Sequence, residues 1–129
     1  ETARPFGDTG SDPYQGTRSV MNWGANADVL DHWSKLGQFR KNNFAVGAGS
    51  QTDLGNSTYG RTKTISGFVN NVVIKLGASG STSVSVAGFF ADGDLVRDAY
   101  TNATATVASG SVTFTAGAEG VILIEKVTP

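Results

Sequence analysis

The chain has 129 residues, of which 39% are apolar, and this is enough to close one modest hydrophobic core. Its 10 basic residues nearly balance its 11 acidic ones, so the sequence gives no electrostatic footprint for binding nucleic acid or an anionic membrane. It contains no cysteine and only one histidine, His32, which excludes disulfides, thiolate chemistry and a histidine-rich metal site.

The first 24 residues form the least regular part of the sequence. They contain Pro5 and Pro13 among scattered Gly, Asp, Ser and Thr residues, with neither helical nor strand periodicity, which predicts an irregular loop. The chain starts at Glu1 without a methionine or a signal peptide, and it has no apolar run long enough to span a bilayer. We therefore expect a processed chain or a cut fragment.

Residues 26–40 carry the pattern of an amphipathic helix. Apolar residues recur at spacings of three and four from Val29 through Trp33 and Leu36, and Asn26 precedes them as a candidate N-cap. Cationic residues follow in the last turn and two asparagines then end the pattern. The apolar stripe requires a packing partner, and we expect Trp33 to be its main anchor.

After residue 43 the sequence predicts short strands separated by turns. Eight such segments without further helices are typical of an antiparallel sandwich, in which two sheets cover each other. We expect a hairpin over residues 103–115 around Ser109-Gly110, and a second turn at Asp92-Gly93. The expected strands are residues 44–51, 59–65, 71–76, 82–87, 95–100, 103–107, 111–115 and 120–126.

The search for catalytic residues is largely negative. His32 lies in the helical stripe, far from any nucleophile motif, and is predicted to be structural or on the surface. Residues 46–50 lack the lysine and the following helix of a phosphate-binding loop. The carboxylates do not form a pair suited to glycosidic acid and base catalysis, and their spacing does not match a calcium-binding EF-hand. Turn formation and solvation are the simpler roles for Asp8, Asp12, Asp92, Asp94, Asp98, Glu119 and Glu125.

Aromatic residues are the best candidates for ligand binding. A flat apolar ring with a polar edge can stack on a sugar, and Tyr14, Trp23, Tyr59 and Tyr100 are the candidates. Core or interdomain packing is the commoner role for such residues, because the chain has few large side chains to fill an interior.

Several segments resemble the end of the catalytic domain and the terminal β-domain of bacterial α-amylases. Residues 33–40 form a W-x-K-L-x-x-F-R run, and residues 45–49 continue it as Ala-Val-Gly-Ala-Gly. Residues 1–5 are similar to the segment after the eighth barrel strand, and residues 84–93, 95–100 and 121–125 are similar to strands of the terminal domain. Asn43-Phe44 departs from the His-Pro that is common in that family.

The resemblance implies that residues 1–42 are the end of a (β/α)8 catalytic barrel, with its last helix, and that residues 43–129 are a C-terminal Greek-key β-sandwich. The catalytic Asp and Glu residues of the family would all precede Glu1, so this chain would be non-catalytic. Its partners would be the barrel of the same parent chain and an α-1,4-glucan such as starch. Tyr14 and Trp23 would lie near the sugar cleft of a secreted or periplasmic enzyme. No cofactor or metal site is expected in this chain, and a calcium ion in the parent stays open.

The alternative is a free-standing β-sandwich module that binds carbohydrate or mediates adhesion. The two hypotheses differ over the stripe of Val29, Trp33 and Leu36. An independent module would bury these side chains in its own sheets, whereas a domain cut from a barrel would leave much of the stripe poorly covered.

Overall fold

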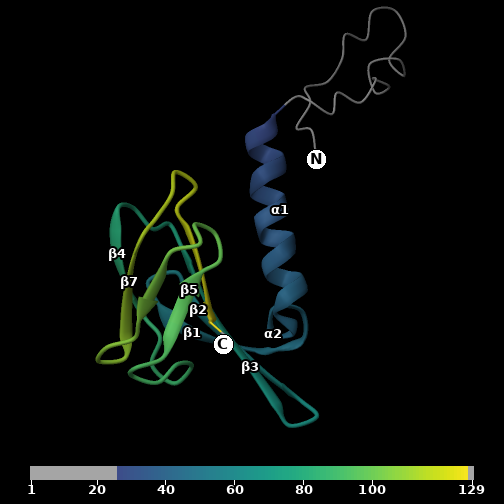
Figure 1. Cartoon of the computed structure of the whole chain (residues 1–129), viewed down its shortest axis with the longest axis vertical. Helices are drawn as coiled ribbons and strands as arrows, with labels where there is room; N and C mark the ends of the chain where they lie inside the picture. Colours follow the sequence, from purple (N-terminus) through teal and green to yellow (C-terminus); the bar gives the residue numbers. More distant parts are fainter. Residues whose placement is uncertain (1–25, 128–129) are drawn as a thin grey trace, which may run out of the picture. The chain divides into compact units, whose positions relative to one another are not determined.

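The computed structural model describes residues 26–127 (Figure 1). The chain divides into two compact units, residues 1–36 and residues 37–129. Within the described residues, the first unit holds the start of helix α1. The second holds the end of α1, the short helix α2 and every strand.

Helix α1, Ala27–Asn42, confirms the predicted helix and ends two residues later than expected. Asp28 in its first turn and Arg40 and Lys41 in its last turn carry the charges that the helix dipole favours. A Lys35–Asp31 ion pair of 2.7 Å bridges one turn of the exposed surface. The helix stops where the Asn43 backbone N–H and side-chain amide both donate to the Phe39 carbonyl.

The apolar stripe of α1 is poorly covered. Phe39 is the buried residue of this helix, with 4% of its surface exposed. Leu30 and Trp33 are 51% and 52% exposed, so Trp33 is not the buried anchor that the stripe predicts.

Helix α2, Phe44–Ala48, replaces the first half of the strand predicted over residues 44–51. The apolar run Phe-Ala-Val suits either structure, and tertiary contacts decide in favour of the helix. Ala45 is fully buried, and Gly49 ends the helix by donating to the Ala45 carbonyl. A side chain at Gly49 would meet the Ala45 and Thr62 carbonyl oxygens within 3 Å, so only glycine fits this close approach.

The remaining strands confirm the mainly β fold class and lie within a few residues of their predicted positions. The structure describes one six-stranded sheet in the order β1-β2-β3-β8-β5-β6 and a two-stranded sheet β4-β7, all antiparallel. The strands are β1 Ser50–Gly55, β2 Thr58–Ile65, β3 Phe68–Leu76, β4 Ser81–Ser85, β5 Leu95–Asp98, β6 Thr104–Thr106, β7 Ser111–Thr115 and β8 Val121–Lys126.

The hairpin predicted over residues 103–115 is wrong, although its turn is correct. Ser109 and Gly110 both have positive φ, and Ala108 and Ser111 exchange two backbone hydrogen bonds across them. Beyond this turn the two arms separate, because β6 pairs with β5 and β7 pairs with β4. The chain therefore crosses from one sheet to the other at this turn. The turn at Asp92-Gly93 is confirmed by the Asp94 N–H donating to the Ala91 carbonyl.

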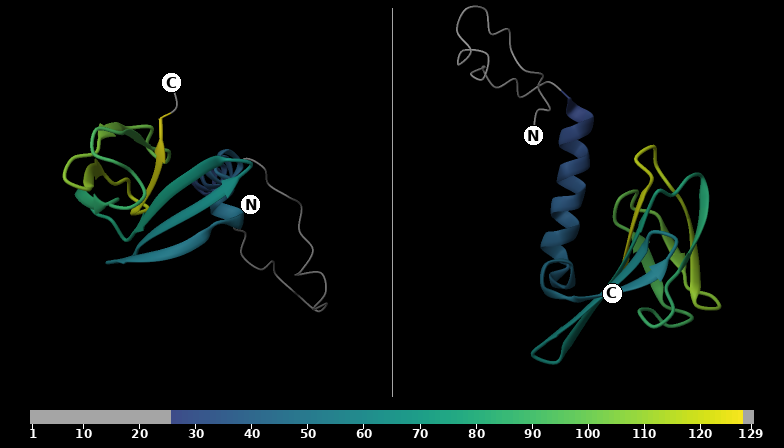
Figure 2. Two further views of the ribbon diagram at one scale, coloured as in Figure 1. Left: turned by 90° about the horizontal axis from the view of Figure 1, so that it is seen from below. Right: turned by 180° about the vertical axis from the view of Figure 1, so that it is seen from behind.

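The core lies between the two sheets. Val84, Val112 and Phe114 of the small sheet meet buried residues of the large one, including Val96 and Ile122. Figure 2 shows β4 and β7 facing the other strands across this layer.

The structure confirms the packing role predicted for Tyr100 and corrects the solvated role predicted for Asp98. Tyr100 is 4% exposed and packs in the interior, so it offers no sugar platform. Asp98 is fully buried rather than solvated, and it accepts hydrogen bonds from the backbone N–H groups of Tyr100 and Leu123 and from the Thr101 hydroxyl. Asp98, at the end of β5, thus connects this strand to β8 through the Leu123 N–H.

Candidate functional site

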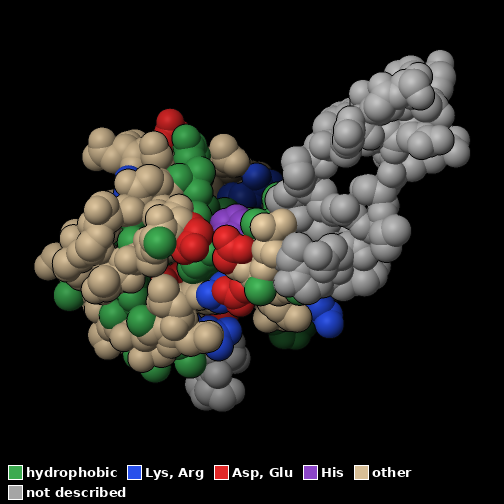
Figure 3. All heavy atoms as spheres, turned by 90° about the horizontal axis from the view of Figure 1, so that it is seen from above, with side chains coloured by type: hydrophobic (Ala, Val, Ile, Leu, Met, Phe, Trp, Pro, Cys, Tyr) green, Lys and Arg blue, Asp and Glu red, His purple; other side chains and the backbone are tan. Residues whose placement is uncertain are grey.

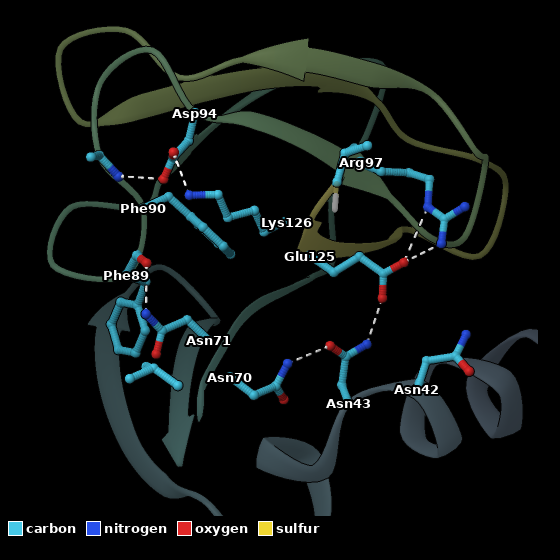
Figure 4. Close-up of a pocket in the computed structure, with 13 residues that line it drawn as sticks. Asn42, Asn43, Asn70, Asn71, Phe89, Phe90, Asp94, Arg97, Glu125 and Lys126 are labelled. Carbon is cyan, nitrogen blue, oxygen red and sulfur yellow. Dashed lines mark hydrogen bonds and ion pairs between the residues drawn. The ribbon is translucent and has the colours of Figure 1, made fainter. Parts of the chain in front are cut away.

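A polar concavity of about 690 Å³ lies where α1 ends against the sandwich. It collects side chains from the end of α1, from β3, from the turn before β5, and from β5 and β8 (Figure 4). All of these segments belong to the second unit. Its walls are mainly amides and charged groups, chiefly Asn43, Asn70, Asp94, Arg97, Glu125 and Lys126.

Glu125 is the centre of the concavity and is only 7% exposed. It occupies β8 directly after three buried apolar residues, so the strand brings a carboxylate to the rim of the core. Arg97 on the neighbouring strand β5 lies directly opposite and forms an ion pair with Oε1 through its guanidinium. The other oxygen, Oε2, accepts a hydrogen bond from the Asn43 side-chain amide. Both carboxylate oxygens are thus engaged, as burial of a charge requires.

Asn43 connects this carboxylate to the end of α1. Its amide nitrogen also donates to the Phe39 carbonyl at 3.1 Å, and its side-chain oxygen accepts from Asn70 Nδ2 at 3.0 Å. The Asn70 side-chain oxygen in turn accepts the Ala45 backbone N–H at 3.0 Å. A continuous chain of hydrogen bonds therefore runs from β5 through β8 to both helices and β3. We call Asn43, Asn70, Arg97 and Glu125 the junction network.

Arg61 of β2 fastens the other side of α2. Its Nε donates to the Ala45 carbonyl at 3.0 Å, and a terminal nitrogen donates to the Gly49 carbonyl at 2.8 Å. The Ala45 carbonyl also accepts the Gly49 N–H, and Gly49 directly follows α2. Arg61 therefore joins the carbonyl groups of α2 and of the residue after it to β2 and holds the short helix against the sheet.

The far rim of the concavity is held by a second ion pair. Lys126 Nζ lies 2.6 Å from Asp94 Oδ1, and the Ala91 backbone N–H donates to the other Asp94 oxygen. The hydrogen bond from Lys126 is the main reason why the pKa of Asp94 lies below its ordinary value, and the Ala91 N–H adds to the effect.

Phe89 shapes the same rim by filling a glycine notch. Its carbonyl accepts a hydrogen bond from the Asn71 side chain at 2.9 Å. Its ring lies on Gly60 of β2, where an added Cβ would come within 2.1 Å of ring carbons. The Phe89 ring therefore packs on β2 at Gly60.

The chemistry of this site is that of a structural junction. Asp94 forms an ion pair with Lys126, and Glu125 forms one with Arg97. Every polar side-chain atom that is fully buried in the described residues has a hydrogen-bond partner. Residues 26–127 contain no group of three or more His, Cys, Asp or Glu that could hold a metal ion. Neither described helix combines the length and apolar character needed to cross a bilayer. On the face in Figure 3, charged side chains are few and mixed in sign.

The residues predicted to contact sugar, Tyr14 and Trp23, lie outside the described residues, as does the loop that contains them. Tyr59 is partly buried in β2, and His32 packs its ring edge-on against Trp33 within α1. The sequence analysis missed the junction network and treated Glu125 as a solvated charge, which is wrong. A signal was present, because a lone glutamate after Val-Ile-Leu-Ile needs a buried partner.

The fold and the junction define an all-β domain joined firmly to the end of a preceding helix, and comparisons with known proteins agree. No family model matches the chain. It is 57% identical over 58 residues to the periplasmic α-amylase of Escherichia coli K12, a match that covers 42% of this chain and 9% of that protein. The chain thus spans a small part of this relative's length.

A solved structure supports the fold. The crystal structure of an Anoxybacillus α-amylase superposes with a TM-score of 0.59 over 88% of this chain and 26% of that protein, at 18% identity. The structural match shows that this chain shares its fold with part of that protein, and the sequence match is limited to a short segment of the periplasmic α-amylase.

Proposed function

We propose that this chain is the C-terminal part of an α-amylase-type glycoside hydrolase that acts on α-1,4-glucans such as starch. Residues 1–42 are the end of the catalytic barrel, and residues 43–129 are the terminal domain. The part is non-catalytic and stabilises the barrel. Its partners are that barrel and the glucan, with Tyr14 and Trp23 as candidate sugar contacts. A periplasmic or extracellular location follows from the relative's periplasmic name.

The observation that carries this proposal is the junction network. The four side chains of this network link the end of α1 to β3, β5 and β8. Two of them, Asn43 and Glu125, are buried. A buried charged cluster of this kind is costly to desolvate and is best explained as specifying one orientation. An orientation matters when the helix belongs to another domain.

Leu30 and Trp33 in the apolar stripe of α1 are about half exposed. A barrel packed on this helix would cover them.

The test compares the 129-residue chain with the longer polypeptide encoded by its gene. We expect the longer polypeptide to release reducing ends from soluble starch and the chain alone to release none. Glucan turnover by the chain alone, at a rate comparable with the longer polypeptide, would contradict the proposal. Absence of starch hydrolysis by a folded longer polypeptide would contradict the assigned substrate.

A further inference from the structure

The walls of the concavity carry polar groups that the junction network does not use. Asn42 lines the concavity and is exposed, and no described residue forms a hydrogen bond with its side-chain amide (Figure 4). Arg97 donates to Glu125 through Nε and one terminal nitrogen, which leaves the N–H groups of the other terminal nitrogen available. Asn71 donates one amide N–H to the Phe89 carbonyl and has a second N–H on the same nitrogen. The concavity therefore presents unused donors and acceptors to a ligand.

The charges around the concavity are balanced. Asp94 pairs with Lys126 and Glu125 pairs with Arg97, so the four charged side chains that line it carry no net charge. An ionic ligand would have to compete with these pairs, whereas a neutral ligand leaves them intact. A hydroxyl group both donates and accepts hydrogen bonds, and an amide side chain can serve it in both directions. The polar wall thus favours a neutral ligand with several hydroxyl groups.

An apolar surface lies beside these polar groups. Val69 lines the concavity and is 63% exposed, and Phe89 also lines it and is partly exposed. A sugar has hydroxyl groups at the edge of its ring and C–H groups on its faces, so one ring can contact both kinds of wall. The cavity volume of about 690 Å³ lies within the range of roughly 300–1,000 Å³ that is usual for small-molecule sites. Size and chemistry both fit a short saccharide.

Contacts within the protein fix the walls of the concavity. Asn43 is buried and its side chain is hydrogen-bonded to Glu125, Asn70 and the Phe39 carbonyl, so the end of α1 that carries Asn42 has a defined position against the sandwich. A site that is rigid before binding loses less conformational entropy when its ligand enters. The junction network therefore also preorganises the concavity.

We propose that the concavity is a carbohydrate-binding site that takes a short segment of α-1,4-glucan, in addition to the sugar contacts proposed at Tyr14 and Trp23. The choice of a neutral saccharide rests on the balanced charges, the unused amide groups and the exposed Val69 side chain. The choice of an α-1,4-linked glucan rests on the proposed function. Binding of the polymer at this site would keep it at a high effective concentration near the rest of the enzyme.

The experiment titrates maltoheptaose into the isotope-labelled chain and follows side-chain amide signals by nuclear magnetic resonance. Asn42 and Asn71 report on the concavity. Asn56 and Asn102 are the controls, because these exposed residues lie between β1 and β2 and between β5 and β6 and do not line it. We expect saturable shifts at Asn42 and Asn71 up to about 10 mM maltoheptaose, which detects a Kd in the millimolar range, and unchanged control signals. A parallel titration uses a β-1,4-linked cello-oligosaccharide, which we expect to bind more weakly.

Two variants separate binding in the concavity from binding elsewhere. Asn42→Ala removes an amide from the wall and places a good helix former in the last turn of α1. We expect it to weaken maltoheptaose binding about fivefold, the usual effect of losing one hydrogen bond. Gln38→Ala is the matched control, because Gln38 is an exposed amide on α1 that does not line the concavity, and its Kd should equal that of the wild type. Both variants should melt within about 3 °C of the wild type.

Several results would overturn the inference. The site is refuted if Asn42 and Asn71 show no saturable shift with maltoheptaose, or if Asn42→Ala and Gln38→Ala bind it equally well. Shifts confined to the tryptophan indole signals would place the glucan outside the concavity. Equal binding of the cello-oligosaccharide would overturn the assignment to an α-1,4-glucan. Each of these results leaves the proposed function intact, since that fails only if a folded longer polypeptide does not hydrolyse starch.

Discussion

Single polar residues carry much of the specificity of this domain. Glu125 places a carboxylate directly after three buried apolar residues of β8. Arg97 pairs with one of its oxygens, and the Asn43 side chain donates a hydrogen bond to the other. Asn43 is 4% exposed, so its amide has no access to water if these partners are lost. The position of α1's end therefore depends on a carboxylate 82 residues away in the sequence.

Removing that carboxylate should be costly. We expect Glu125→Ala to lower the free energy of unfolding by about 2 kcal/mol, because the buried Asn43 amide and part of the Arg97 guanidinium lose their acceptor. Glu119→Ala is the control, since Glu119 is exposed and should change stability by less than about 0.5 kcal/mol. Urea unfolding of both variants gives the comparison. Equal effects would show that the junction network does not stabilise the domain.

At the scale of elements, pairing partners were set by distant residues. The arms on either side of Ser109-Gly110 join different sheets because Val107 and Val112 both enter the core between them. The Phe-Ala-Val run became α2 because Asn70 and Arg61 supply its end groups with partners. Local pattern could not distinguish these outcomes, since both contacts come from strands later in the chain.

The Asp94–Lys126 pair joins the turn before β5 to the end of β8, and it should make stability depend on pH. The folded pKa of Asp94 is lowered, so the pair's contribution is present above the unfolded pKa and is lost as the pH falls through the folded pKa. We expect Asp94→Asn to destabilise the chain at pH 7 and to have little effect once the pH has fallen below the folded pKa of Asp94.

Urea unfolding across this pH range measures the difference between the two proteins. Lys126→Met is the matched variant, because it removes the main cause of the lowered pKa and should abolish most of the Asp94→Asn effect at pH 7. A difference in stability between wild type and Asp94→Asn that stayed constant as the pH fell from 7 through the folded pKa of Asp94 would contradict the assignment.

For the whole molecule, the described residues form a complete sandwich attached to an incompletely covered helix. The core between the sheets is closed by buried residues of five strands and connecting segments, whereas Leu30 and Trp33 are about half exposed. Under the proposed function, the exposed side chains of α1 would belong to an interface with the barrel.

Trp33 and Phe39 should therefore behave differently in the isolated chain. Trp33→Ala should change the free energy of unfolding by no more than about 1 kcal/mol, whereas Phe39→Ala should cost about 3 kcal/mol or more, because Phe39 is 4% exposed. In the longer polypeptide we expect the cost of Trp33→Ala to rise to about 3 kcal/mol, because the proposed barrel would cover it. A large cost in the isolated chain would show that Trp33 has a packing partner within it.

The sequence by itself determined the helix, the positions of seven of the eight strands and the turns at Asp92-Gly93 and Ser109-Gly110. These depend on periodicity, dipole-matched charges and the few residues that accept positive φ, which are local properties. Only the tertiary structure decided that residues 44–48 are helical and that Asp98 and Glu125 are buried. The partners of these residues are supplied by strands elsewhere in the chain. The apolar run before Glu125 indicated that this carboxylate needs a partner, but only the fold identifies Arg97 and Asn43 as the donors.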